Sequence, residues 1–179
     1  MDRVPVRYAP KNLTSGDRKK QLQQLAKSRR MYKRGKYYTR KRVPSFKNRK
    51  SSHLSRARAL YGVEKITPSE ELAAATGCSV DALEKIVNKG AGAYFSSGSR
   101  PNQTAQSWGY ARLASAVTSG NASIVDYHII EEGCDHSKPA YKLAKKASEK
   151  ASAKASAKAS EKASAKASEK TAIINAAAL

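Results

Sequence analysis

The sequence has few cysteines and no long apolar run. Its 179 residues include two cysteines, two phenylalanines and one tryptophan. A helix that spans a bilayer needs about 20 apolar residues, and no run approaches that length. The first ten residues also lack the apolar segment of a signal peptide. These absences predict an intracellular or virion protein without a membrane span. Two thiols in a chain of this length favour reduced cysteines, although pairing of Cys78 with Cys134 stays open.

Acidic residues are scarce at both ends of the chain. Residues 1–60 contain 20 Lys and Arg against 2 acids, residues 61–140 contain 6 against 9, and residues 141–179 contain 9 against 3. The net charge of +21 therefore comes from the flanks. Strongly basic flanks usually bind polyanions or acidic surfaces. We predict three parts: a basic N-terminal arm with one amphipathic helix (1–50), a small globular domain (51–135) and a Lys/Ala/Ser repeat tail (136–179).

Capping residues and apolar periodicity predict mostly helices. Serine and threonine caps, followed by glycine stops, predict helices over residues 14–35, 51–62, 67–77, 79–90 and 104–118. Residues 123–132, SIVDYHIIEE, are rich in β-branched and aromatic side chains and predict the one strand. The expected fold is a small, mainly α domain with one minor β element, flanked by extended basic arms. The four-residue repeat of the tail is helix-competent but contains nothing that forms a core.

Residues 71–90, ELAAATGCSVDALEKIVNKG, resemble the helix-turn-helix family. Small Ala73 allows close helix crossing, Gly77 permits a tight turn, and Ser79 opens the second helix. In a DNA-reading protein the start of that second helix would contact bases. Asp81 and Glu84 on that face would repel phosphates. A structural or partner-binding helix pair is therefore favoured, with DNA reading as the alternative.

The basic arm interleaves cations with tyrosines. Its cations can neutralise phosphates, and its tyrosines can stack on bases or fill pockets. Nucleic acid and an acidic protein surface both remain open as partners. The predicted binding residues are Arg29, Arg30, Tyr32, Lys33, Arg34, Lys36, Tyr37, Tyr38, Arg40, Lys41, Arg42, Lys47, Arg49 and Lys50.

Residues 93–115, AYFSSGSRPNQTAQSWGYARLAS, are the most distinctive stretch. They contain neither the Gly-Lys-Ser/Thr ending of a phosphate-binding P-loop nor the glycine spacing of a nucleophile elbow. We predict a fixed turn followed by a capped helix, with both arginines bonded to carbonyls or to the acids of 126–132. The structural residues would be Gly98, Arg100, Pro101, Trp108, Tyr110 and Arg112.

No catalytic, metal or cofactor site is predicted. Cys134, Asp135 and His136 offer ligand atoms, but their spacing does not suit a Cys/His zinc site. The serines at 96, 97 and 99 have no histidine nearby in sequence to act as a base, although His128 or His136 could approach in space. No small-molecule substrate is expected.

Four segments resemble an uncharacterised domain of large nucleocytoplasmic DNA viruses, including those of algae, and a related signature occurs in phages. They are GKYYTRKRVPSFKNRKSSH, GAYFSSGSRPNQT, SWGYARLAS and VDYHIIEEGC, within residues 12–134. The resemblance implies a viral origin and a virion component. It implies no known catalytic residues.

The expected function is that of a non-enzymatic minor capsid protein, located in the virion and made in the infected host cell. Its basic arms would bind major and minor capsid proteins or the inner surface of the shell, because arms that order on a partner cover much surface from a short chain. The alternative is a DNA-binding or genome-condensing virion protein that uses the arm and the helix pair on viral double-stranded DNA.

Overall fold

A computed structural model describes residues 4–48 and 50–176, with side chains described up to residue 161. The predicted binding residue Arg49 and the tail residues 177–179 lie outside the described residues. The described chain is mainly helical and contains no strand. Its elements are η1 (Val6–Tyr8), α1 (Ser15–Tyr32), α2 (Ser52–Tyr61), α3 (Glu70–Thr76), α4 (Val80–Ser96), α5 (Ala105–Ala116), α6 (Asn121–Val125), α7 (Tyr127–Gly133) and α8 (Pro139–Ala176).

Several predicted helix ends are confirmed. The side chains of Thr14 and Ser79 accept hydrogen bonds from the free backbone N–H groups of Asp17 and Ala82, as N-caps do. Gly62 and Gly77 end α2 and α3 in the left-handed conformation, with φ of 65° and 77°. Thr104 caps α5 through a reciprocal capping box with Ser107.

Two predicted helix boundaries are wrong. Ser69, not Thr67, caps α3, because its side chain accepts from Leu72 N and the helix begins at Glu70. Gly90 does not stop α4, which continues to Ser96. Gly90 therefore serves packing within a helix.

The α4–α5 pair is the centre of the fold, and glycines set how closely its helices approach. A Cβ on Gly90 would lie 2.7 Å from Gly109 Cα, and a Cβ on Gly109 would lie 2.7 Å from Val87 O. Real Cβ atoms do not tolerate such distances. Around this crossing, burial of apolar side chains supplies the main favourable free energy. The fully buried side chains here include Leu72, Leu83, Ile86, Leu113, Val117 and Ile130.

Replacing Gly109 with alanine should separate α4 from α5. Overpacking of this kind costs about 1–3 kcal/mol, and alanine returns about 1 kcal/mol of helix propensity, so we expect net destabilisation of roughly 1 kcal/mol, measured by urea unfolding. Gly92→Ala is the matched control, because a Cβ there has only Tyr32 Oη nearby, at 3.9 Å. It should raise the free energy of unfolding. Stabilisation by both substitutions would contradict the close approach.

The predicted strand over residues 123–132 is wrong, because this segment forms α6 and α7. Asp126 lies between the two helices, is fully buried and closes backbone bonds on both sides: its N–H donates to Ala122 O, and its carbonyl accepts from Ile130 N. Helical spacing turns Ile130 into the core and leaves Val125 exposed. Tertiary packing here overrides the β propensity of the side chains.

The prediction of reduced cysteines is also wrong. Cys78, in the turn between α3 and α4, and Cys134, after α7, form a disulfide bond. Two backbone hydrogen bonds flank it, from Ser79 N to Gly133 O at 2.8 Å and from Asp135 N to Gly77 O at 2.7 Å. This small cross-link fixes the α3–α4 turn to the segment that leads into α8.

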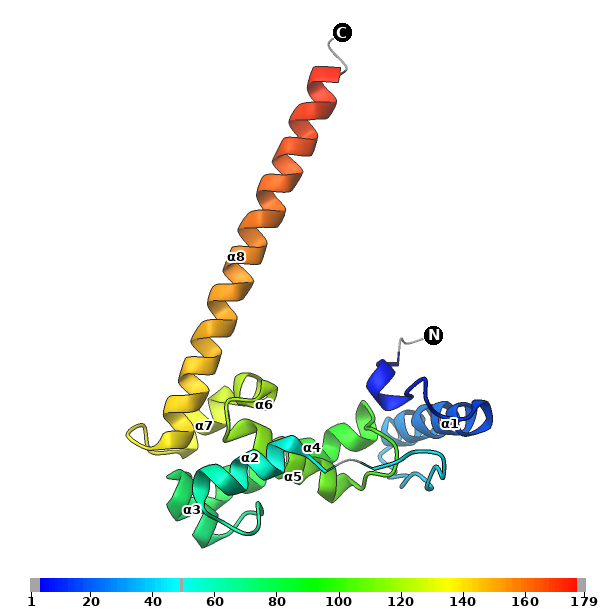
Figure 1. The fold of residues 1–179 in the computed structure, drawn as a ribbon, viewed down its shortest axis with the longest axis vertical. Helices are drawn as coiled ribbons and strands as arrows, with labels where there is room; N and C mark the ends of the chain where they lie inside the picture. The colour runs from blue at the N-terminus through cyan, green and yellow to red at the C-terminus, as the bar shows by residue number, and fades with distance from the viewer. Residues whose placement is uncertain (1–3, 49, 177–179) are drawn as a thin grey trace.

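Residues 4–48, which we call the basic N-terminal unit, are folded onto the domain and not extended as predicted. Tyr8, Leu13, Leu25 and Val43 in this unit are buried. The unit packs on the C-terminal end of α4, at the opposite end of the α4–α5 pair from α8 (Figure 1). Residues 9–14 and 36–48 of the unit contain no helix.

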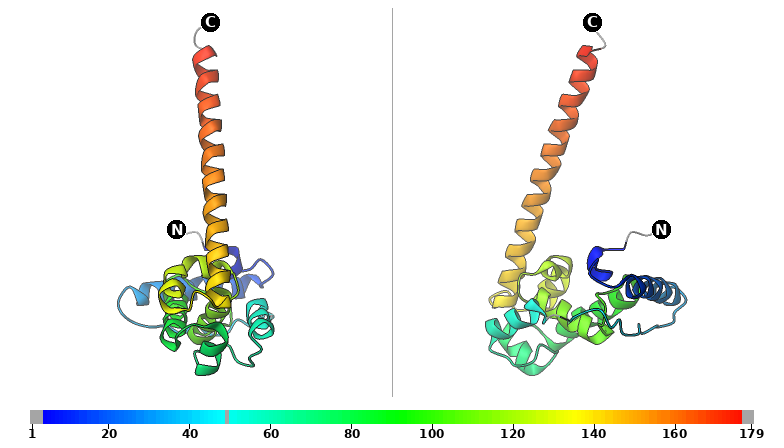
Figure 2. Two further views of the ribbon diagram at one scale, coloured as in Figure 1. Left: turned by 90° about the vertical axis from the view of Figure 1, so that its left-hand side faces the viewer. Right: turned by 45° about the vertical axis from the view of Figure 1, so that its right-hand side comes forward.

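Helix α8 begins in the core and then leaves it. Ala140, Tyr141 and Ala144 are buried against α6 and α7. Beyond this first part the helix projects away from the rest of the molecule in all three views (Figure 1, Figure 2). None of the described helices combines the length and the hydropathy required to cross a membrane.

Candidate polyanion-binding surface

The basic N-terminal unit carries dense positive charge on its surface. Within residues 4–48, Asp17 is the one acid. Among the described residues, none of these surface cations forms an ion pair. The ion pairs of the described residues join Lys85 to Asp81, and Lys89 and Arg112 to Asp126. Exposed cations of the predicted binding set are Arg30, Lys33, Arg34, Lys36, Lys41, Arg42, Lys47 and Lys50; the unit adds Arg7, Lys11, Arg18, Lys19, Lys20 and Lys27.

Two cations of the predicted set serve structure instead. The Arg40 guanidinium lies 3.7 Å from the centroid of the Tyr94 ring and donates to Tyr94 O at 2.9 Å and to Ser99 Oγ at 2.7 Å. Burial lowers the pKa of Arg40. Arg29 donates to Ser97 O through Nε and Nη2, at 3.1 and 2.7 Å. These two arginines attach the unit to the end of α4.

Polar side chains that the sequence did not single out hold residues 36–48 in place. Gln24 exchanges hydrogen bonds with both backbone groups of Lys41. Asn102 accepts from Val43 N at 2.7 Å and donates to Val43 O at 3.1 Å. Asparagine and glutamine pair with backbone amides in this way because they carry both a donor and an acceptor. Asn102 has a positive φ of 58°, which is unusual for a residue other than glycine.

The single acid of the unit is used internally. Asp17 Oδ2 accepts from Ser45 N at 2.8 Å, while Ser45 Oγ faces Thr14 N at 3.3 Å. Hydrogen bonds from the Ser45 side chain and backbone lower the pKa of Asp17. The carboxylate therefore stays charged in the folded state and fixes residues 36–48 to the start of α1.

Two of the signature residues, Gly98 and Trp108, contact the basic N-terminal unit. Gly98 has φ of 107°, and a Cβ there would lie 2.7 Å from Leu25 Cδ2. Pro101 is buried, and Trp108 packs edge-on against Tyr8 with ring centroids 6.0 Å apart. Arg100 is exposed. These positions give the stretch a role in packing.

The predicted pairing of Arg112 with an acid of residues 126–132 is confirmed. Arg112 donates to both carboxylate oxygens of Asp126, from Nε at 2.6 Å and from Nη2 at 2.7 Å. Lys89 Nζ lies 3.0 Å from Asp126 Oδ1. A bidentate arginine pair of this kind is strong and directional. It joins α5 to the α6–α7 junction.

The structure brings no histidine to the serines at 96, 97 and 99. Ser99 is buried and donates to Arg100 O. His128 contacts Lys89, and His136 stacks on Tyr141 with ring centroids 3.8 Å apart. Among the described side chains, no group of three or more metal-ligating residues was found.

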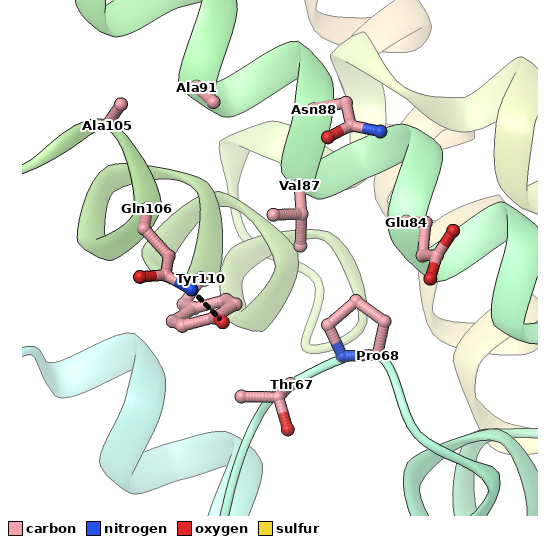
Figure 3. Close-up of a pocket in the computed structure, with 9 residues that line it drawn as sticks. All are labelled: Thr67, Pro68, Glu84, Val87, Asn88, Ala91, Ala105, Gln106 and Tyr110. Carbon is pink, nitrogen blue, oxygen red and sulfur yellow. Dashed lines mark hydrogen bonds between the residues drawn. The ribbon is translucent and has the colours of Figure 1, made fainter.

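A shallow pocket lies between α4, α5 and the loop before α3 (Figure 3). Its wall contains one ionisable acid, Glu84, and a hydrogen bond from Gln106 to the Tyr110 hydroxyl, 2.8 Å long, lies along one side (Figure 3). No acid–base pair faces this pocket. The exposed start of α4 presents Asp81, whose carboxylate pairs with Lys85 Nζ at 2.7 Å.

Residues 5–129 match the sequence model of DUF5824, a family of unknown function. The match covers the basic N-terminal unit and the helices through α6, and it ends before α8. Neither the comparison with curated proteins nor the comparison with solved structures found a match. The chain belongs to the DUF5824 family.

Proposed function

We propose that this chain is a non-enzymatic structural protein of a virus particle, a minor capsid protein that binds acidic surfaces of neighbouring capsid subunits. The observation that carries the proposal is the distribution of charge. The basic N-terminal unit and α8 are cationic and lie at opposite ends of a nearly neutral hub (Figure 1). Such a molecule can bridge two acidic partners. The viral setting comes from the resemblance of residues 12–134 to a domain of large DNA viruses.

The folded state of the N-terminal unit refines this role. A preformed surface loses less conformational entropy on binding than an extended arm does. Helix α8 keeps the arm-like part of the proposal: its repeat contains Lys150, Lys154 and Lys158, which wind around the helix because a four-residue period drifts by about 40° per repeat. A helix whose lysines spiral along its length, instead of forming one face, suits a channel or crevice lined by acids.

The proposal predicts that the chain is a stoichiometric component of purified particles of the virus that encodes it. Quantitative mass spectrometry measures its copy number, and absence from purified particles would refute the capsid role. Replacing Lys33 and Lys36 with glutamine should lower incorporation several-fold. Lys65→Gln with Arg100→Gln removes the same charge from the hub and is the matched control, expected to be incorporated as the wild type is.

Binding of double-stranded DNA is the second candidate, favoured by the density of unpaired cations on the N-terminal unit. With six or more phosphate contacts, the affinity for a DNA duplex should fall by about 10³-fold or more between 50 and 200 mM salt. Loss of all DNA retention at about 150 mM salt, where surface charges are only partly screened, would exclude this candidate and leave an acidic protein as the partner.

A further inference from the structure

A row of aromatic rings runs from the core to the surface beside the unpaired cations. Tyr94 is fully buried and meets Phe95 edge-on, with centroids 4.9 Å apart. The Phe95 ring lies 4.9 Å from that of Tyr37, which in turn lies 6.1 Å from that of Tyr32. Tyr37 lies between Phe95 and Tyr32 in this row and is its most exposed member, at 70%. These rings come from α4, from the end of α1 and from the loop after α1.

The exposed face of Tyr37 distinguishes it from the other tyrosines of the unit. Lys27 Nζ covers the Tyr38 ring at 4.5 Å, Tyr8 is buried and packs against Trp108, and Tyr32 is 37% exposed against 70% for Tyr37. Within the described residues no cation lies over the Tyr37 ring. The Tyr37 ring is therefore widely exposed and is also held in contact with two other rings, those of Phe95 and Tyr32.

The backbone around Tyr37 is held in a defined turn. Gly35 N donates to Tyr32 O at 3.0 Å, and Lys36 N donates to Met31 O at 3.0 Å. Gly35 has φ of 69°, a conformation that other residues rarely adopt. Lys33, Arg34 and Lys36, which lie within four residues of Tyr37 in this turn, are exposed. The turn therefore keeps the backbone of the cations close to that of the ring.

We propose that Tyr37, supported by Phe95 and Tyr32, is a stacking site for an unpaired base, and that the adjacent cations bind the backbone of a single-stranded nucleic acid. Single-stranded binding surfaces combine these two elements: cations that follow the phosphates and aromatic rings that stack on bases. An acidic protein surface needs the cations but not the free ring face, and a duplex keeps its bases paired. The inference goes beyond the capsid role, because it gives the N-terminal unit a second class of partner.

The test is fluorescence anisotropy of the full chain with a labelled 20-nucleotide thymidine oligomer and with an abasic oligomer of equal length, at about 150 mM salt. Stacking contributes about 5- to 150-fold in affinity per base, so Tyr37→Leu should weaken binding of the thymidine oligomer by at least about 5-fold. Tyr37→Phe, which keeps the ring, should bind as the wild type does. The abasic oligomer should bind wild type and Tyr37→Leu equally.

Charge variants separate this inference from general polyanion binding. Lys33→Gln with Lys36→Gln should weaken both oligomers by a similar factor. The stacking site is refuted if Tyr37→Leu binds the thymidine oligomer as tightly as the wild type does. It is also refuted if the wild type binds the abasic oligomer as tightly as the thymidine oligomer. In both cases the charge-based function stands. Because the Tyr37 side chain is mostly exposed, we expect an unchanged melting temperature; a lower melting temperature together with unchanged binding also refutes the inference.

Discussion

Replacing Cys78 and Cys134 together with serine should lower the free energy of unfolding by about 4 kcal/mol. The disulfide joins residues 56 positions apart, so it restricts a long loop of the unfolded chain. In the chain-entropy description, the stabilisation grows with the logarithm of the number of residues in the loop. It is about 3 kcal/mol for a loop of about 15 residues and about 4.7 kcal/mol for one of about 100 residues, so this loop falls between them. For a small helical domain, 4 kcal/mol is a large share of total stability.

The disulfide also has a local effect, because it sits beside the start of α8. Without it, the junction between α7 and α8 is held by the flanking hydrogen bonds Ser79 N to Gly133 O and Asp135 N to Gly77 O and by the packing of these helices on α4 and α6. We expect faster hydrogen exchange at the amides of residues 139–144 than at those of α4. Urea unfolding followed by circular dichroism measures the global change. The reduced wild type should unfold at the same urea midpoint as the double serine variant, and reductant should not change the midpoint of the variant. If the oxidised wild type, the reduced wild type and the variant all had the same midpoint, the prediction would be contradicted.

Local signals in the sequence predicted the helix ends well, and tertiary contacts explain the failures. The sequence correctly predicts the caps at Thr14 and Ser79 and the stops at Gly62 and Gly77. These helix ends depend only on backbone groups a few residues away, so the local sequence is enough to predict them. In the sequence, Gly90 looks like the glycine that ends a helix. In the structure it lets α5 pack closely against α4, and α5 is 15 or more residues away in the chain. Propensity cannot reveal such a contact.

The strand prediction failed for a related reason. Residues 123–132 have β-branched side chains, yet Asp126 lies within them and pairs with Arg112. In the structure this carboxylate meets its partners on α4 and α5 at the junction between two short helices. The cost of an unpaired buried charge exceeds the small free-energy differences among β propensities.

The candidate surface was only partly predictable. The sequence identifies which residues are cationic, but it does not reveal which of them are consumed by the fold. Arg40 bonds groups 54 and 59 residues away, and Arg29 bonds Ser97, 68 residues away. Once those two are removed from the binding set, the remaining cations around Tyr37 define a smaller and more testable surface.

Asp126 is the second position where a large effect is expected. Its side chain is fully buried and faces two cations, Arg112 and Lys89, whose own side chains are 20% and 40% exposed. Removing one partner of a buried pair leaves the others without a counter-charge and costs about 3–5 kcal/mol. Because water reaches Arg112 and Lys89, we expect Asp126→Ala to lower the free energy of unfolding by about 3 kcal/mol, the lower end of that range.

A double-mutant cycle tests whether this loss comes from the ion pair. Arg112→Leu alone should be destabilising, because it leaves the Asp126 carboxylate buried with only Lys89 near it. Combined with Asp126→Ala it should cost less than the sum of the single changes, by about 1 kcal/mol or more, since contacting partners are not additive. Arg100→Ala, in the same signature stretch but exposed, is the control and should change stability by about 0.5 kcal/mol or less. Additive single changes would mean that α5 and the α6–α7 junction are held together by packing, with the charges as bystanders.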